Sequence, residues 1–172
     1  MRVIGVAGYS GSGKTYISQC LKTWCEKHDY IVHLISFDSV KEKNLSRKKK
    51  HQTVQDELQD TLTALFVKEK EHYSTLCKWE LECEFKETIV IIDGVSFLDD
   101  IKFIHLFNGD VIFVDASQRL DIPTLQTARE HLANAVTFGK YPLGMFSKII
   151  NNNLSKTALD RSLSRVLPNL VG

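Results

Sequence analysis

The sequence predicts an α/β protein in which helices cover both faces of a mostly parallel sheet. Apolar runs alternate with helical patterns along the 172 residues, and strands that alternate with helices favour parallel βαβ units. The run Thr88–Asp93 is β-branched and continuously apolar up to its final aspartate, which is typical of a strand buried on both faces. A glycine-rich turn directly follows the first apolar run, as expected where a strand leads into a helix. We therefore expect three layers, with the sheet in the middle.

Five strands and six helices follow from these patterns. The strands are expected at residues 3–7, 30–37, 88–93, 110–115 and, more weakly, 147–151. The helices are expected near residues 14–28, 52–72, 74–84, 98–107, 122–136 and 155–166. A length of 172 residues suits one domain, so we expect residues 1–172 to form a single unit. Within it, residues 38–87 are expected to form a helical insertion.

Composition narrows the class of partner. A formal net charge of +1 gives no overall attraction to nucleic acid or to a membrane surface. No run approaches the roughly 18 apolar residues that a membrane helix needs. The first predicted strand begins almost at the first residue, so we expect no signal peptide. The four cysteines form no C-x-x-C pair, so we expect reduced thiols and a cytoplasmic location.

The segment Gly8–Thr15 fits the pattern G-x-x-x-x-G-K-[ST] and lies between a strand and an amphipathic helix. Such a loop directs backbone N–H groups at phosphates, because the first turn of a helix leaves its amides without helical partners. Lys14 would reach the β- and γ-phosphates, and the Thr15 hydroxyl would bind Mg²⁺. The sequence therefore predicts a nucleoside triphosphate site. Its expected contacts are Gly8, Ser10, Gly11, Ser12, Gly13, Lys14 and Thr15.

Two aspartates follow strands at the edge of the sheet where parallel α/β folds bind ligands. Asp93 ends the most apolar run and is followed by Gly94, so it could hold the Mg²⁺ hydration shell. Asp38 follows the second strand and could accept the proton of an attacking hydroxyl. The alternative for both residues is a strand end or helix cap without catalytic function.

Positive charge is expected opposite a transferred phosphate. Arg119 and Arg129 flank the start of a predicted helix in the region 116–146, which could close over the phosphates as a lid. The basic run 47–50, including Arg47 and Lys48, falls in the insertion and could bind a phosphorylated small molecule or a nucleic-acid backbone. Solvated surface residues are the alternative for both groups.

Three asparagines link the last predicted strand to the last helix. The amide of Asn152 could bind the edge of an adenine base. The simpler alternative is a turn in which asparagine is tolerated in left-handed geometry, with Ser155 as the helix N-cap.

The phosphate loop, Asp38, the segment Ile91–Val95 and the run Lys148–Asn153 together resemble the P-loop kinases of the nucleoside-monophosphate kinase superfamily. The resemblance is to dephospho-CoA kinases and viral-type deoxynucleoside monophosphate kinases in particular. It implies a three-layer P-loop NTPase fold with a five-stranded parallel sheet in the order 2-3-1-4-5. It also implies transfer of the ATP γ-phosphoryl group to a hydroxyl or phosphate acceptor. Two features depart from that pattern: Ser96-Phe97 stands where an arginine is usual, and the lid region is poor in arginine.

Three functions are compatible with these features. The first is an ATP- and Mg²⁺-dependent kinase acting on a nucleotide or nucleotide-like acceptor, such as a deoxynucleoside monophosphate. Lys14, Asp38, Asp93, Arg119 and Arg129 are its expected catalytic residues. The second is a kinase acting on a polynucleotide end or a modified DNA base, which the basic run suggests. The third is a non-catalytic regulator that binds nucleotide, which the sparse lid suggests.

Overall fold

The computed structural model describes residues 1–37, 59–64, 67, 87–95, 98–120 and 143–171. Its centre is a five-stranded, all-parallel sheet in the order β2-β3-β1-β4-β5, which confirms the predicted fold and strand order. The strands are β1 (Arg2–Gly8), β2 (Ile31–Ser36), β3 (Thr88–Val95), β4 (Asp110–Asp115) and β5 (Lys148–Asn151). The helices are α1 (Lys14–Lys27), α4 (Leu98–Leu106), the short η3 (Leu143–Met145) and α6 (Lys156–Val171).

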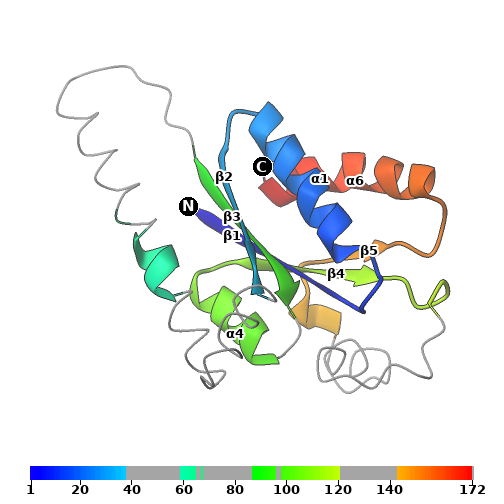
Figure 1. Ribbon diagram of the computed structural model, residues 1–172, viewed down its shortest axis with the longest axis horizontal. Coiled ribbons are helices and arrows are strands. Elements are labelled where there is room, and N and C mark those ends of the chain that lie inside the picture. The colour runs from blue at the N-terminus through cyan, green and yellow to red at the C-terminus, as the bar shows by residue number, and fades with distance from the viewer. Residues whose placement is uncertain (38–58, 65–66, 68–86, 96–97, 121–142, 172) are drawn as a thin grey trace.

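Helices lie on both faces of the sheet, so the described residues form three layers. In Figure 1, α1 and α6 lie on one side of the sheet and α4 on the other. Alternate residues of β1 enter two separate apolar clusters: Ile4 and Val6 pack with α1 and α6, whereas Val3 and Ala7 pack on the side of α4. All eight residues of β3 are buried, as its unbroken apolar run predicts.

The segment 59–64 is helical, in agreement with the helix expected near 52–72. Its Leu62 is fully buried in the cluster on the α4 side, together with Phe37. The helices expected near 74–84 and 122–136 lie outside the described residues.

Helix α6 extends five residues beyond the predicted end at 166, so that prediction was wrong. It continues through Pro168, which has no N–H and normally disrupts a helix interior. The extension places three more apolar side chains, Leu167, Leu170 and Val171, in the core. Burying each such side chain contributes about 1.5–3 kcal/mol, which offsets the roughly 3 kcal/mol cost of the proline. Arg2 also donates from Nη1 to the Leu170 carbonyl (2.9 Å) and so holds the end of the helix.

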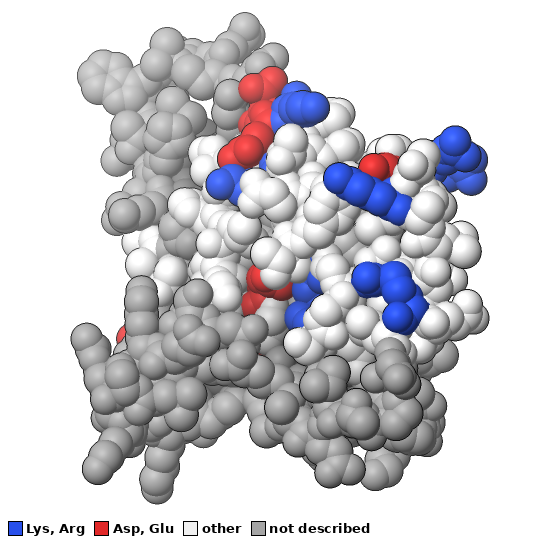
Figure 2. Space-filling view, turned by 45° about the vertical axis from the view of Figure 1, so that its right-hand side comes forward, with Lys and Arg blue, Asp and Glu red and all other residues white. Residues whose placement is uncertain are grey.

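Charged side chains of both signs lie on the face that Figure 2 shows. On the face that Figure 2 shows, Lys and Arg are intermixed with Asp and Glu and do not gather into one patch. This agrees with the formal net charge of +1. Within the described ranges, no helix combines the length and apolar character that crossing a membrane requires.

Candidate active site

The loop between β1 and α1 is shaped by glycines in conformations that other residues rarely adopt. Gly11 has φ 75°, and Gly13, the N-cap of α1, has φ 95° and ψ 20°. A side chain at Gly8 would clash with the sheet, because its Cβ would lie 2.7 Å from the Val114 carbonyl oxygen. The loop therefore packs directly onto β4 and follows the tight path that the motif predicts.

This loop directs the N-terminus of α1 to the carboxyl edge of the sheet. The first helical hydrogen bond runs from the Ile17 N–H to the Gly13 carbonyl (3.0 Å). Amides of the first turn precede that bond, which is the arrangement that binds anions at helix N-termini. The Lys14 ammonium lies over the start of the loop and donates to the carbonyls of Gly8 (3.0 Å) and Tyr9 (2.7 Å). A cation and a helix N-terminus thus meet at one point.

Asp93 and Thr15, 78 residues apart, meet beside the loop. The Thr15 hydroxyl donates to Asp93 Oδ2 (2.9 Å). The other carboxylate oxygen, Oδ1, is buried and has no hydrogen-bond partner among the described residues, and Asp93 as a whole is only 8% exposed. A buried carboxylate oxygen without a partner, next to a hydroxyl, fits a hard cation such as Mg²⁺, which prefers oxygen ligands. These two side chains could hold that metal.

A β-bulge places Asp93 in this position. Val6 is in register with Asp93, but the next residue of β1, Ala7, is in register with Val95. The extra residue is Gly94, at φ 83°. Because a bulge re-aims the side chains beside it, the Asp-Gly pair explains how a carboxylate at the end of a buried strand can face the loop.

Arg119 and Asn152 contact the same loop from the other side. Arg119 donates from Nη2 to the Gly11 carbonyl (3.0 Å) and from Nε to the Asn152 carbonyl (3.2 Å). The Asn152 side chain donates from Nδ2 to the Ser12 carbonyl (2.6 Å). Arg119, Asn152 and the phosphate loop come from three distant segments of the sequence, and the sequence analysis expects all three in one site. The structure brings them together.

A cavity of about 390 Å³ opens beside these contacts. Pockets of roughly 300–1,000 Å³ are typical of small-molecule sites. Sequence reasoning selected Gly11, Gly13, Arg119 and Asn152 for this region but missed the apolar and aromatic part of the wall. That part comprises Tyr16, Leu154 and Leu159, and sequence reasoning also missed the cation of Lys156 in the same wall.

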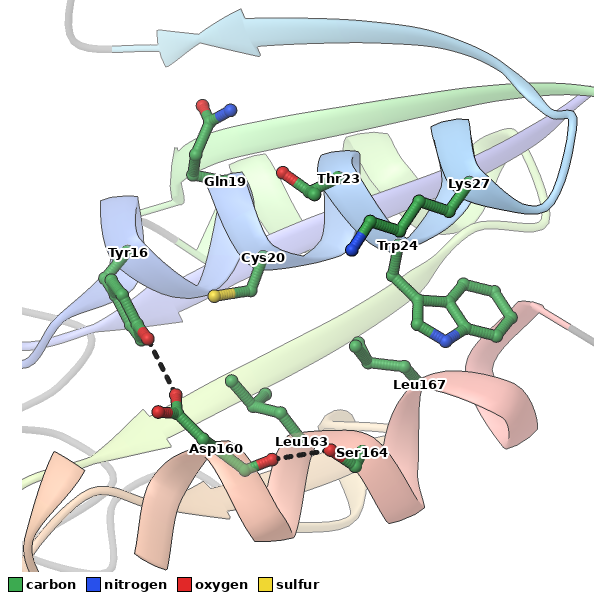
Figure 3. A pocket seen from close by; sticks show the side chains of 10 residues that line it. All are labelled: Tyr16, Gln19, Cys20, Thr23, Trp24, Lys27, Asp160, Leu163, Ser164 and Leu167. Atoms are coloured by element: carbon green, nitrogen blue, oxygen red, sulfur yellow. Dashed lines mark hydrogen bonds between the residues drawn. The ribbon is translucent and has the colours of Figure 1, made fainter. Parts of the chain in front are cut away.

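Tyr16 also joins α1 to α6. Its hydroxyl donates to Asp160 Oδ1 (2.6 Å), as Figure 3 shows, and Lys156 Nζ lies 5.2 Å from the centre of its ring. The hydrogen bond to Asp160 raises the pKa of the Tyr16 phenol, so the phenol stays a donor at neutral pH. On the far side of Tyr16, α1 and α6 enclose a shallow groove of about 380 Å³.

Four predicted site residues cannot be placed. Asp38, Arg47, Lys48 and Arg129 lie outside the described residues, so their roles stay predictions. The strand that leads to Asp38 is described, and its last residue, Ser36, is in register with Asp93.

Solved structures share this fold. A shikimate kinase from Bacteroides thetaiotaomicron has a TM-score of 0.54 at 15% identity, over 99% of each chain. A gluconokinase from Sinorhizobium meliloti 1021 has a TM-score of 0.54 at 13% identity, over 99% of this chain and 95% of its own. The APS kinase CysC of Mycobacterium tuberculosis, in complex with AMPPNP and APS, has a TM-score of 0.52 at 14% identity, over 99% of this chain and 98% of its own.

The sequence matches no protein-family model and no curated protein. The similarity therefore lies in the structure. The chain has the fold of the small P-loop kinases, with a phosphate-loop motif at the position that the fold requires.

Proposed function

We propose that the chain is an ATP- and Mg²⁺-dependent kinase that transfers the γ-phosphoryl group to a nucleotide or nucleotide-like acceptor. The observation that carries this proposal is the 2.9 Å hydrogen bond between Thr15 and Asp93, beside the N-terminus of α1. It joins the hydroxyl of the phosphate-loop motif to a carboxylate at the end of the neighbouring strand, and phosphoryl transfer on this fold needs both groups at the metal. The kinases with the same fold support the reaction type.

The residues of the site have separate roles in the proposed reaction. The loop amides and the Lys14 ammonium bind the β- and γ-phosphates, and Thr15 and Asp93 hold Mg²⁺. When bound, the metal supplies positive charge that offsets the charge developing on the phosphate oxygens. Arg119 stands at the loop and adds a second cation there. Catalysis then depends on alignment and charge stabilisation by groups that are fixed before the substrate arrives.

The acceptor side of the proposed site is formed by residues that follow β2 and by the predicted lid. Asp38 is proposed as the base that orients or deprotonates the acceptor, because it follows a strand whose last residue is level with Asp93. Arg47 and Lys48 are proposed to bind the acceptor phosphate, and Arg129 to close the lid. A cytoplasmic location belongs to the same proposal and rests on the free thiols of Cys20 and Cys25.

The test follows labelled phosphate. The purified protein is incubated with γ-labelled ATP, Mg²⁺ and a panel of nucleoside monophosphates, dephospho-CoA and oligonucleotides. We expect label on a nucleotide or nucleotide-like acceptor. Label on oligonucleotides alone would replace this proposal with a polynucleotide kinase, and label in water alone would indicate a nucleotide-binding regulator.

The control variant for this test is Lys14→Ala. Removing one preorganised cation at the reacting phosphate should lower turnover by about a hundredfold or more. Because the Lys14 side chain is only partly buried and its hydrogen bonds to Gly8 and Tyr9 stay within the loop, the variant should unfold at nearly the wild-type temperature. Transfer that survives this substitution at the wild-type rate would contradict the proposed phosphate contact.

A further inference from the structure

We propose that Asn152 is a positioning residue of the phosphate loop, which acts through the Ser12 carbonyl and serves any polyphosphate whatever its base. The proposal rests on the proposed function, because it assumes that the loop binds phosphate. It differs from the sequence-based interpretation, in which the same amide binds the edge of adenine.

The side-chain amide of Asn152 lies against the phosphate loop. Asn152 Nδ2 donates to the Ser12 carbonyl at 2.6 Å, across 140 residues of chain. The residue is only 8% exposed, and a Cβ added to Gly13 would lie 2.7 Å from this nitrogen. The amide therefore fits against the loop backbone itself, and any side chain at Gly13 would displace it.

The hydrogen bond from Asn152 sets the orientation of the peptide group between Ser12 and Gly13. The Ser12 carbonyl and the Gly13 N–H belong to one peptide unit, and no peptide bond in the described residues is cis. In a trans unit the N–H and C=O point in opposite directions. By holding the carbonyl, Asn152 fixes the Gly13 N–H on the opposite side, away from itself. The peptide group therefore presents its N–H, the positive end of its dipole, on the side opposite Asn152.

This peptide group needs a partner outside the loop to hold its orientation. Gly13 has φ 95°, and glycine reaches positive and negative φ at similar cost. Without the hydrogen bond, the unit has alternative orientations that would turn a carbonyl toward the phosphates. A fixed donor array binds an anion more tightly than one that must first be ordered.

Asn152 is itself held in place by two backbone hydrogen bonds. Its backbone N–H donates to the Asp115 carbonyl at the end of β4 (2.6 Å), and its carbonyl accepts from Arg119 Nε (3.2 Å). Arg119 continues to the Gly11 carbonyl (3.0 Å), so a second carbonyl of the loop is held from the same side. The Asn152 amide and the Arg119 guanidinium thus hold the loop against the sheet.

The experiment compares two ligands that share a polyphosphate and differ in having a base. Calorimetric titration measures the binding of ATP and of inorganic tripolyphosphate, both with Mg²⁺, to the wild type and to Asn152→Leu, which keeps the size but lacks the donor. We expect the variant to bind both ligands about tenfold more weakly, which is the effect of one buried hydrogen bond. Weaker ATP binding with unchanged tripolyphosphate binding would overturn the proposal in favour of base recognition.

The matched control is Asn153→Leu, from the same loop. Asn153 contacts the Gln118 N–H (2.7 Å) and Asp115 Oδ2 (3.3 Å), and neither of these contacts involves the phosphate loop. The Asn153→Leu variant should bind tripolyphosphate within about twofold of the wild-type affinity, because no donor to the phosphate loop is lost. An equal loss in this variant would mean that general disturbance of the linker, and not the Ser12 contact, weakens binding.

Two further outcomes separate the proposals. Thermal unfolding without ligand shows whether each variant is folded, and Asn152→Ser replaces the leucine variant if that one is not. If the wild type binds neither ligand, the proposed function fails and this inference fails with it. If the wild type binds both ligands and the Asn152 variants match it, only the role of Asn152 is refuted.

Discussion

The position of the Asp93 carboxylate lowers the stability of the fold but suits a metal ligand. Its carboxylate is almost fully buried, yet Oδ1 has no hydrogen-bond partner among the described residues. Leaving a buried polar atom without a partner costs about 1–3 kcal/mol. The fold tolerates this cost where a bulge at Gly94 aims the group at the phosphate loop, which is the expected position for a metal ligand.

The substitution Asp93→Asn should separate the two effects. The amide oxygen that it introduces can still accept a hydrogen bond from Thr15, but the negative charge is lost. We expect Mg²⁺-dependent turnover to fall about a hundredfold or more, because the metal loses a charged ligand. The free energy of unfolding, measured with urea in EDTA, should be at least that of the wild type.

The matched control is Asp115→Asn, at the end of the adjacent strand β4. Asp115 accepts from the Ser117 N–H (2.9 Å) and from Asn153 Nδ2 (3.3 Å), so both of these contacts are structural. Its substitution should leave the Mg²⁺ dependence of turnover unchanged. If both variants lose activity to the same degree, Asp93 has no special relation to the metal.

Sequence reasoning identifies individual site residues where the chemistry lies in one segment. The run Gly8–Thr15 could be read because a strand, a glycine turn and a helix follow one another directly. The contact of Asn152 with Ser12 could not be read in the same way, because a hydrogen bond across 140 residues depends on the tertiary fold. Tyr16 and Leu159 carry no motif, so their place in the cavity wall emerges only once α1 and α6 are packed.

Individual elements follow their local patterns closely, with one instructive failure. Strand β3 was expected at Thr88–Asp93 and continues to Val95, because the bulge at Gly94 lets pairing resume. Helix α6 was expected to end before Pro168, and local propensity supports that expectation. Burial of Leu167 and Leu170 outweighs the local propensity of Pro168 to end the helix. Their burial depends on the sheet that α6 covers.

The turn from α4 into β4 leaves no space for a Cβ atom at Gly109. A Cβ at Gly109 would lie 2.8 Å from the Val3 carbonyl oxygen and 2.9 Å from the Ile104 carbonyl oxygen. Backbone atoms of two elements cannot move as easily as a side-chain end. Gly109→Ala should therefore lower the free energy of unfolding by about 1–3 kcal/mol, as measured by urea denaturation.

Gly144, in η3, provides the comparison. A Cβ there would meet no atom within 4 Å, so Gly144→Ala should change the free energy of unfolding by less than about 0.5 kcal/mol. Similar effects of the two substitutions would show that steric contact at Gly109 is not what limits this turn.

For the whole molecule, the sequence predicted the class of fold but not by itself the arrangement of its strands. Alternating strands and helices indicate a parallel sheet, and each apolar run finds its place within it. The order 2-3-1-4-5 came from the resemblance to P-loop kinases, because no local pattern says which strands are neighbours. The sheet confirms that order, including the position of β3 between β1 and β2.

One buried thiol should make the stability of the molecule sensitive to alkaline pH. Burial raises the pKa of Cys25 in α1 from its ordinary value of 9.0 to about 11. The folded state then keeps its proton at pH values where the unfolded state has lost it. This contribution to stability is complete below pH 9 and is lost progressively as the pH rises to about 11.

The measurement is the difference in free energy of unfolding between the wild type and Cys25→Ala, across roughly pH 8 to 11.5. The wild type should be the more stable protein at the lower end of this range, and its advantage should shrink steadily above pH 9. Subtracting the alanine variant removes the contributions of other groups that titrate in this range. A difference that stays constant with pH would contradict the assigned effect of burial on the thiol.

The central place of β1 has a consequence for how the protein is made. Its neighbours, β3 and β4, begin at Thr88 and Asp110, and β2 pairs with β3 instead of with β1. A nascent chain that has left the ribosome only as far as Ser36 thus carries the whole phosphate-loop motif but no pair of adjoining strands. Such distant pairings slow folding, since a long loop must close before contacts compensate for the lost entropy. The strand that leads into the motif gains its first complete neighbour only after translation has passed Val95.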